Sequence, residues 1–321
     1  MNLSNTGSNF TTAVYRDTLN TAIIKNGITV VLCLSINYVN STLVYTFTKH
    51  QVFNVNPRYI LYIHLVINDI ILLSLFTLLQ VLSYIVYTLN ISLCIVLVMI
   101  STIASLNNPL TLAFMAVECY IAICFPLRHT QICTVRKTYV VIGLIWAISI
   151  LSITPDLFVA LATESLEFFR SRVFCLRDNV FRDPNLTVKR DVSNSVCMVI
   201  VWLTLFYTYF WILFAAKAAA KDAKKARNTV LLHGFQLLLC MLTYVYHLII
   251  QGLTYLFPNE ALAIRFTASI FIQVLPRLMS PVVYGLRDKT FRNHLKRYLF
   301  CSTSATTHPQ TTQKQGIKSS F

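Results

Sequence analysis

Ionisable side chains are rare in the long apolar runs of this sequence, and two of them carry opposite charges. Measured along a helix, Asp69 lies about 16 Å beyond Arg58. Arg277 lies about 15 Å before Arg287, and so reaches a similar depth in its own run. An unpaired charge at such a depth is costly. We predict that Asp69 and Arg277 form an ion pair, the alternative being that each finds water or backbone carbonyl groups separately.

Two prolines and a tyrosine close to Arg277 suggest a helix that can change conformation. Arg277, Pro281 and Tyr284 have the i, i+4, i+7 spacing that places side chains on one face of a helix. Pro276 and Pro281 each remove a helix hydrogen bond, which predicts a kink. A kinked helix beside a buried ion pair can act as a switch, although a static bend fits the same residues.

A second group of side chains suggests a mainly apolar cavity that offers a small molecule a few hydrogen bonds. Its members lie at similar depths in three apolar runs: Ser101, Thr102, Ser105, Met241, Tyr244, His247, Ser269 and Gln273. Taken singly, each is better explained by packing or by a hydrogen bond between helices. The prediction of a binding site therefore rests on the cluster. Asp156 is expected to reach the polar boundary, so no carboxylate is predicted in the cavity.

Two of the nine cysteines are placed to form a disulfide. Cys94 begins an apolar run, and Cys175 lies in a long polar loop on the same predicted side. A bond between them would tie that loop over the helices. Cys197 is a rival partner. Cys301 follows the basic stretch 288–300 and is a candidate for palmitoylation, the alternative being a plain thiol.

Helices that cross a membrane must position these residues. The chain is 56% hydrophobic and 12% charged, whereas soluble domains are about a quarter charged. Seven apolar runs exceed the roughly 20 residues that a transmembrane helix needs: 27–48, 59–84, 91–124, 138–161, 193–216, 229–253 and 261–285. None has the two-residue alternation of barrel strands. The expected fold is an all-α membrane protein, a seven-transmembrane helix bundle followed by a short amphipathic C-terminal helix.

The charge pattern orients this bundle. If the C-terminus is cytoplasmic, most of the 27 Lys and Arg residues face inside, as the positive-inside rule requires. We expect an extracellular segment at 1–26, a seven-transmembrane domain at 27–285, and a cytoplasmic amphipathic helix and tail at 286–321. The sequons at Asn2, Asn9 and Asn185 then face outside and are predicted glycosylation sites. The net charge of +15 is largely a topology signal, so nucleic acid is not an expected partner.

Four motifs follow one another at the ends of the predicted spans. They are "PRYILYIHLVINDI" (57–70), "MAVECYIAICFPLRH" (115–129), "KARNTVLLH" (225–233) and "PRLMSPVVYGLRD" (276–288). The second is similar to the signature Met-Ala-x-Asp-Arg-Tyr-x-Ala-Ile-Cys-x-Pro-Leu-Arg-Tyr, and the last to Pro-x-Leu-x-Asn-Pro-x-Ile-Tyr-x-x-Arg. Over nearly its whole length the chain resembles class A G-protein-coupled receptors, specifically odorant receptors of the fish type.

The resemblance implies a role for Glu118. In this family an acidic residue at the inner end of the third span restrains the resting state, and Glu118 and Tyr120 fill the family's positions. Cys119 stands where the family has arginine, so the usual acid–arginine lock cannot form. Arg128 or Arg227 could pair with Glu118 instead, or Glu118 could be solvated at the helix end.

The resemblance also has implications for Asp69 and for the residues around Arg277 and Pro281. In related receptors the position of Asp69 binds sodium. Arg277 would compete with that cation electrostatically, so no sodium site is expected. Ser280 replaces the family's asparagine before Pro281.

The function that the resemblance implies is odorant reception at the plasma membrane, with an extracellular N-terminus. A small-molecule odorant would bind in the outer half of the bundle, and a heterotrimeric G protein of the olfactory stimulatory type would bind inside. Membrane lipid is the remaining partner, and no cofactor or metal is expected.

Four other functions compete with odorant reception. A transporter tends to show inverted repeats and helices broken at the midplane, and no internal repeat is visible. A ligand-gated channel would need a pore lined by an oligomer, which the basic inner loops do not suggest. A non-olfactory class A receptor stays open. An enzyme is not expected, because the chain has no HExxH or GxSxG motif and no carboxylate pair within a span.

Overall fold

Long apolar helices make up most of the fold. The computed structural model describes residues 19–86, 88–218, 249–250, 252–257 and 260–278, with Phe235 and Tyr246. The long helices are α1 (Leu19–Lys49), α3 (Pro57–Ile85), α4 (Ile91–Cys124), α6 (Val135–Thr163) and α9 (Pro184–Ala218). All five are long and apolar enough to cross a membrane. A shorter helix, α11 (Ala261–Ser269), continues into the π-helical stretch η2 (Ile270–Val274).

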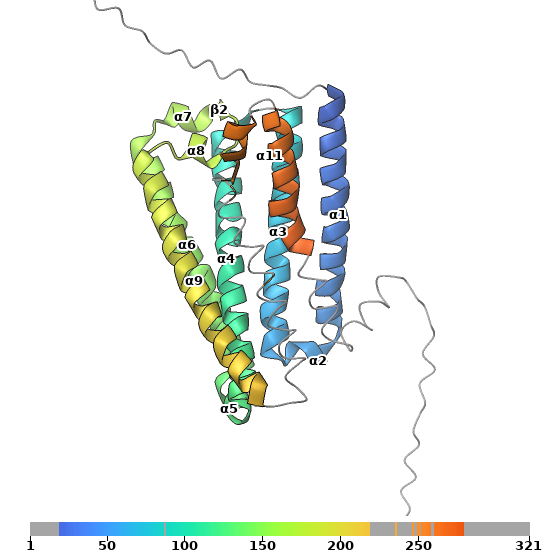
Figure 1. Ribbon diagram of the computed structural model, residues 1–321. Coiled ribbons are helices and arrows are strands. Elements are labelled where there is room, and N and C mark those ends of the chain that lie inside the picture. The colour runs from blue at the N-terminus through green and yellow to red at the C-terminus, as the bar shows by residue number, and fades with distance from the viewer. Residues whose placement is uncertain are drawn as a thin grey trace, which may run out of the picture.

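Short elements gather at the two ends of the bundle (Figure 1). The helices α2 (Gln51–Asn54) and α5 (Pro126–Ile132) lie at one end, called here the α2–α5 end. The helices α7 (Leu166–Arg170) and α8 (Arg177–Val180) lie at the other, the α7–α8 end. The two-residue strands β1 (Leu89–Asn90) and β2 (Arg172–Val173) pair antiparallel, with Leu89 opposite Val173.

Asparagine caps fix where the two central helices begin. Asn56 Oδ1 accepts a hydrogen bond from Arg58 N at 3.1 Å, and Pro57 occupies the first turn of α3. Pro suits that position because its missing N–H would have no helical partner there. Asn90 Oδ1 caps α4 in the same way, accepting from Ser92 N at 2.9 Å. The first cap places Arg58 at the α2–α5 end of α3, where it meets α4.

The helix α4 is the centre of the bundle. It packs against α3, α6 and α9, while α1 packs against α3. Large apolar side chains nevertheless remain exposed on the outer faces of these helices, including Leu93, Ile148 and Phe210. Helices that are apolar on all sides are typical of a bundle surrounded by lipid.

A buried polar network joins α3, α4 and α6. Trp146 Nε1 donates to His64 Nε2 at 2.9 Å, so that ring nitrogen is an acceptor. His64 therefore carries its proton on Nδ1, which lies 3.0 Å from Thr111 Oγ1. Thr111 in turn donates to the backbone oxygen of Asn107, whose side-chain oxygen accepts from Ser149 at 2.7 Å. Because these groups satisfy one another, we interpret the network as a structural link that sets how the three helices lie together.

The long helices confirm the first five predicted spans. The runs 27–48, 59–84 and 138–161 lie within α1, α3 and α6, and 91–124 coincides with α4. The run 193–216 also lies within its helix, α9, which begins earlier at Pro184. Asp183 Oδ1 accepts from Asn185 N at 2.9 Å, and the charge of Lys189 is neutralised within the fold. The helix can therefore extend beyond the apolar run that hydropathy detects.

The last predicted spans are covered only in part. Most of 229–253, the end of 261–285 and the C-terminal amphipathic helix lie outside the described residues. The apolar helical segment Phe266–Leu278 belongs to the seventh span, and its π-helical stretch ends two residues before Pro276. Departure from α geometry next to Pro276 fits the lost hydrogen bond of that residue.

Candidate functional site

A cavity of about 360 Å³ lies between α3, α4, the segment after β2, and η2 with the helical turn that follows it. The described residues that line it are Leu72, Phe76, Leu79, Gln80, Leu82, Ser83, Leu89, Ser101, Ser105, Phe174, Cys175, Leu176, Gln273 and Arg277. Small-molecule sites have volumes of roughly 300–1,000 Å³. The cavity is thus large enough for a small ligand.

The lining combines apolar walls with a few polar groups. Leucines and Phe76 from α3 form one wall, and Ser101 and Ser105 come from α4. Gln273 and Arg277 come from the seventh predicted span. Among the described lining residues, Arg277 is the only charged side chain. This arrangement suits a ligand with an apolar body and a polar group at one end.

A disulfide holds the loop that closes the α7–α8 end of the cavity. Cys94, in the first turn of α4, is bonded to Cys175, and the flanking Phe174 and Leu176 line the cavity. This bond confirms the predicted pairing, and the rival Cys197 is a free thiol in α9. The loop is also tied to α4 by Ser92 Oγ, which donates to Phe169 O at 2.9 Å.

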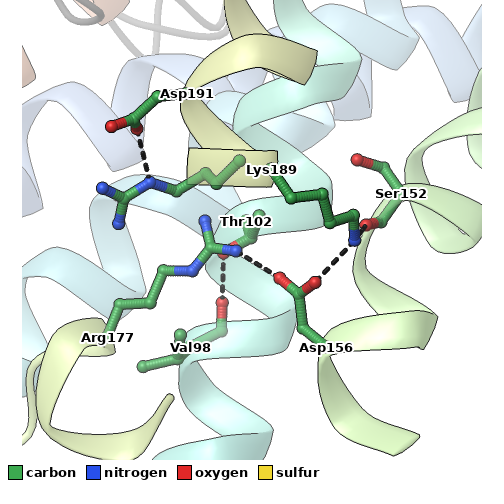
Figure 2. Close-up of polar contacts among 8 residues, drawn as sticks. Val98, Thr102, Ser152, Asp156, Arg177, Lys189 and Asp191 are labelled. Carbon is green, nitrogen blue, oxygen red and sulfur yellow. Dashed lines mark hydrogen bonds and ion pairs between the residues drawn. The ribbon is translucent and has the colours of Figure 1, made fainter. Parts of the chain in front are cut away.

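An ion-pair cluster centred on Asp156 anchors the same loop a second time (Figure 2). Asp156 is 1% exposed, and its two oxygens lie 2.5 Å from Arg177 Nη2 and 2.5 Å from Lys189 Nζ. Lys189 Nζ also donates to the backbone oxygen of Ser152 at 2.8 Å. The prediction that Asp156 reaches the polar boundary is therefore wrong. The two cations offset the desolvation cost of burying this carboxylate.

The ion-pair cluster links three elements. Asp156 belongs to α6, Arg177 to α8 and Lys189 to α9. Arg177 follows Cys175 closely in the chain, so the disulfide and the ion pair hold adjacent parts of one loop. Two anchors of this kind fix how the loop lies over the cavity.

Asp69 and Arg277 are both buried, as predicted for an ion pair at depth. Asn108 Nδ2 donates to Asp69 Oδ1 at 2.9 Å, a partner that the sequence did not suggest. Leu73 of α3 packs in one cluster with Val274 and Leu278, so the segments that hold Asp69 and Arg277 are neighbours. Direct pairing of the two charges stays a prediction.

A second charged cluster surrounds Glu118 at the α2–α5 end of α4. Arg58 Nε donates to Glu118 Oε2 at 2.7 Å, and His129 Nε2 lies 3.0 Å from Glu118 Oε1. Glu118 is 5% exposed, so it is not solvated at the helix end. Pairing with Arg128 is also wrong, because Arg128 is exposed, and Arg227 lies outside the described residues.

The Glu118 cluster joins elements that are distant in the chain. Arg58 is in the first turn of α3, and His129 belongs to α5. The sequence carried a signal for Arg58 in the motif that begins at Pro57, but a pairing across such a separation cannot be deduced from spacing. Burial raises the pKa of the nearby Cys133 thiol, and the charge of Glu118 raises it further. The Cys133 thiol therefore stays protonated at neutral pH and adds no negative charge beside Glu118.

Apolar contacts surround the residues that follow Glu118. Cys119 is buried and packs against Ile212 of α9. The ring of Tyr120 lies edge-on to that of Tyr207, with centroids 5.9 Å apart. At the position where the resembling family has an arginine, this chain thus has an apolar contact between α4 and α9.

The structure places only some of the predicted ligand-binding and modification residues. Ser101, Ser105 and Gln273 line the cavity. Thr102 and Ser269 are absent from the lining, and their hydroxyls donate to the backbone oxygens of Val98 and Phe266. The residues outside the described part of the chain are Asn2, Asn9, Met241, Tyr244, His247, Pro281, Tyr284 and Cys301. Asn185 is exposed in the first turn of α9, and its glycosylation stays a prediction.

One wall of the cavity was missed by the sequence analysis. Leu72, Phe76, Gln80 and Ser83 of α3 all line it. These positions recur every three to four residues from Asp69, the spacing of one helix face. Extending the face of Asp69 toward the α7–α8 end would have found them.

Comparison with known proteins gives consistent matches. The family model described as "7 transmembrane receptor (rhodopsin family)" matches residues 39–284. Odorant receptor 131-2 of Danio rerio is 32% identical over 275 residues, which cover 82% of this chain and 82% of that protein. Olfactory receptor 51B2 of Homo sapiens is 25% identical over 59% of this chain and 62% of that protein. Olfactory receptor 4E2 of Mus musculus is 28% identical over 60% of this chain and 63% of that protein.

Proposed function

Because this chain belongs to the rhodopsin family of seven-transmembrane receptors, and within it to the odorant receptors of the fish type, we propose that it detects a small-molecule odorant. The odorant binds in the cavity between α3, α4 and the seventh helix, and the bound receptor activates a heterotrimeric G protein of the stimulatory olfactory type. The receptor lies in the plasma membrane with the α7–α8 end outside. It is not an enzyme.

The observation that carries the proposal is the cavity itself. It has the size and the mixed apolar and polar lining of a ligand site. The loop that covers it is held by the Cys94–Cys175 disulfide and by the ion pair of Arg177 with Asp156. A small molecule from outside therefore meets a preformed pocket, which lowers the entropy cost of binding. Met241, Tyr244 and His247 of the sixth span remain candidates for completing its lining.

The Glu118 cluster supplies the coupling step of the proposal. In the resting receptor, Glu118 ties α4 to Arg58 of α3 and to His129 of α5. This contact takes over the restraint that an acid–arginine lock would provide if Cys119 were arginine. A ligand can release it only by binding better to the arrangement in which these elements have parted.

The seventh predicted span continues in the sequence from the cavity toward the C-terminus. Arg277 lines the cavity, and Pro281 and Tyr284 follow it toward the C-terminus. The π-helical stretch before Pro276 gives this helix a site where its geometry can change. We place the switch residues Asp69, Arg277, Pro281 and Tyr284 on this path.

A cell assay tests the proposed function. Cells that express the receptor with a stimulatory olfactory α subunit are exposed to a panel of water-soluble odorants and steroids, and cAMP is measured. The expected result is a dose-dependent rise of cAMP for at least one compound, lost when the α subunit is omitted. Uptake of a compound without any cAMP rise would favour a transporter. Activation by compounds unrelated to odorants would favour a non-olfactory receptor of class A.

A further inference from the structure

We propose that a second small-molecule site lies at the α7–α8 end of the bundle, and that it binds a primary ammonium group carried by a short apolar body. The site is a cavity of about 290 Å³, and it shares no described lining residue with the cavity between α3 and α4. Its described lining comes from the end of α6, from α8 and from the residues that lead into α9 (Figure 1). Its volume lies at the lower limit for small-molecule sites, roughly 300 Å³.

The floor of this outer cavity is apolar. Val180, Phe181 and Leu186 are buried residues that line it, and Ala160 of α6 lies in the same hydrophobic cluster. A ligand group that covers these side chains loses contact with water and gains hydrophobic stabilisation. The floor therefore suits the apolar body of a small ligand.

Glu164 lies at an end of α6 that repels its charge. It caps the C-terminal end of the helix, where its backbone N–H donates to Ala160 O at 3.1 Å. A helix carries partial negative charge at this end, so a cation is favoured there and a carboxylate is not. The last turn of α6 has no basic residue, and Glu164 has no ion pair within the described part of the chain. A bound ammonium group would relieve this repulsion.

Asp183 brings a second carboxylate to the outer cavity. Its Oδ1 accepts from Asn185 N at 2.9 Å, which leaves further lone pairs for a ligand. Thr163 also lines the cavity, and its hydroxyl donates to Val159 O at 2.8 Å, so the hydroxyl oxygen can still accept. An ammonium group has three N–H donors and no acceptor. Two carboxylates and one hydroxyl match those three donors.

The one basic residue among the described lining residues is Arg182. Its guanidinium carbon lies 4.5 Å from the centroid of the Phe168 ring, and Phe168 is not among those lining residues. The charge of Arg182 is thus held against a neighbouring ring. Two carboxylates and one guanidinium leave the lining with a net negative charge, which attracts a cation.

The outer cavity is coupled to the loop that covers the odorant cavity. Phe181 lines the outer cavity, and its ring centroid lies 5.9 Å from the guanidinium carbon of Arg177. Arg177 pairs with Asp156 and closely follows Cys175 in the chain. A ligand that packs on Phe181 therefore helps to hold the loop in place. An odorant then pays less to order that loop, which is positive coupling between the two sites.

Thermal unfolding of the purified receptor in detergent tests the second site. The probes are phenethylamine, phenethyl alcohol and phenylacetate, which share an apolar ring and differ in charge. The unfolding temperature should rise with the concentration of phenethylamine, since the ligand binds the folded state. Its apparent affinity should be about tenfold higher than that of the alcohol, because hydrogen bonds between charged groups are stronger. Equal affinities, or tighter binding of phenylacetate, would overturn the site.

Matched variants locate the bound amine. Glu164→Gln with Asp183→Asn removes both charges at nearly unchanged shape, and asparagine can keep the capping bond to α9. This double variant should bind the amine and the alcohol equally. Glu167→Gln, an exposed residue of the same loop outside the lining, should behave as wild type. Ser105→Phe fills the other cavity and should keep the effect of the amine, whereas its loss there would overturn the second site.

A cAMP assay tests the coupling, which rests on the proposed function. Phenethylamine should lower the half-maximal concentration of an activating odorant about fivefold in wild type and leave it unchanged in the double variant. An unchanged or raised concentration in wild type would overturn the coupling. Binding to the purified receptor needs no G protein, so failure there refutes the second site and leaves odorant reception standing. A receptor at the cell surface that no odorant activates refutes the proposed function and the coupling with it.

Discussion

At the scale of single residues, the account depends on how buried charges are partnered. Glu118 accepts from Arg58 and lies beside His129, so one carboxylate connects three elements. Removing Arg58 would leave a nearly buried negative charge with less compensation. The cluster can therefore restrain the α2–α5 end of the bundle for as long as both contacts are intact.

Substitution of Arg58 is expected to raise ligand-independent signalling. Arg58→Met removes the shorter contact of Glu118 and should increase basal cAMP about fivefold, because a bias of roughly 1 kcal/mol shifts a two-state equilibrium by that factor. Basal cAMP is measured at matched surface expression. Arg128→Met is the matched control, since Arg128 is exposed, and it should leave basal cAMP unchanged. Equal basal signalling in Arg58→Met and wild type would refute the restraint.

A double-mutant cycle tests the predicted pairing of Asp69 with Arg277. Arg277→Met should lower surface expression, because it removes the counter-charge of the buried Asp69. Combining it with Asp69→Asn should recover part of the loss, which flow cytometry of a tagged receptor would detect. Additive losses from the two substitutions would count against the pair.

Sequence reasoning identified the charged residues better than their contacts. Asp69, Glu118 and Arg277 could be singled out because charges are rare in apolar runs. Arg58 as a partner of Glu118, and Asn108 as a partner of Asp69, depend on how separate helices pack, which periodicity within one helix does not encode.

At the scale of elements, the loop after α6 determines the shape of the cavity. The disulfide Cys94–Cys175 holds it to α4, and Arg177 holds it to Asp156 of α6. Since Phe174 and Leu176 line the cavity, displacement of this loop would change the site directly.

Substitution of Asp156 is expected to loosen this loop. Asp156→Asn leaves Arg177 and Lys189 without their shared carboxylate and should destabilise the receptor by about 2–3 kcal/mol, below the range for fully buried pairs because both cations reach water. Thermal unfolding of the detergent-solubilised receptor measures the loss. Asp191→Asn is the control, because Asp191 is 63% exposed in its pair with Arg190. Its effect should stay below about 1 kcal/mol. Similar losses in both variants would contradict the anchoring role of Asp156.

The sequence predicts where a helix begins and ends when the helix crosses the bilayer, because the bilayer requires a long apolar run. The bounds of α4 follow from hydropathy, since a transmembrane helix must be a continuous apolar run. The early start of α9 did not follow, because Lys189 is neutralised by a residue of another helix. The small elements α7 and α8 lie outside the long apolar runs, where apolar length carries no signal.

At the scale of the whole molecule, orientation in the membrane decides whether the cavity faces the environment. The N-terminal end of α1 and the α7–α8 loop lie at the same end of the bundle (Figure 1). The excess of Lys and Arg on the opposite side predicts that this end is extracellular.

Epitope tags at the two termini test this orientation. An N-terminal tag should stain on intact cells, and a C-terminal tag should stain only after permeabilisation. Staining of both tags under the same condition would contradict an odd number of spans. Reversal of the two results would place the cavity on the cytoplasmic side.

The central claim is that a ligand in the cavity activates the receptor, and a cavity-filling substitution tests it most directly. Ser105→Phe places a ring into the cavity from α4, whereas Leu93→Phe enlarges a side chain of the same helix that is 49% exposed. The dose response of cAMP to an activating odorant is measured for both variants at matched surface expression. The account predicts that Ser105→Phe loses the response while keeping basal cAMP, and that Leu93→Phe responds as wild type. An unchanged dose response in Ser105→Phe would contradict the claim.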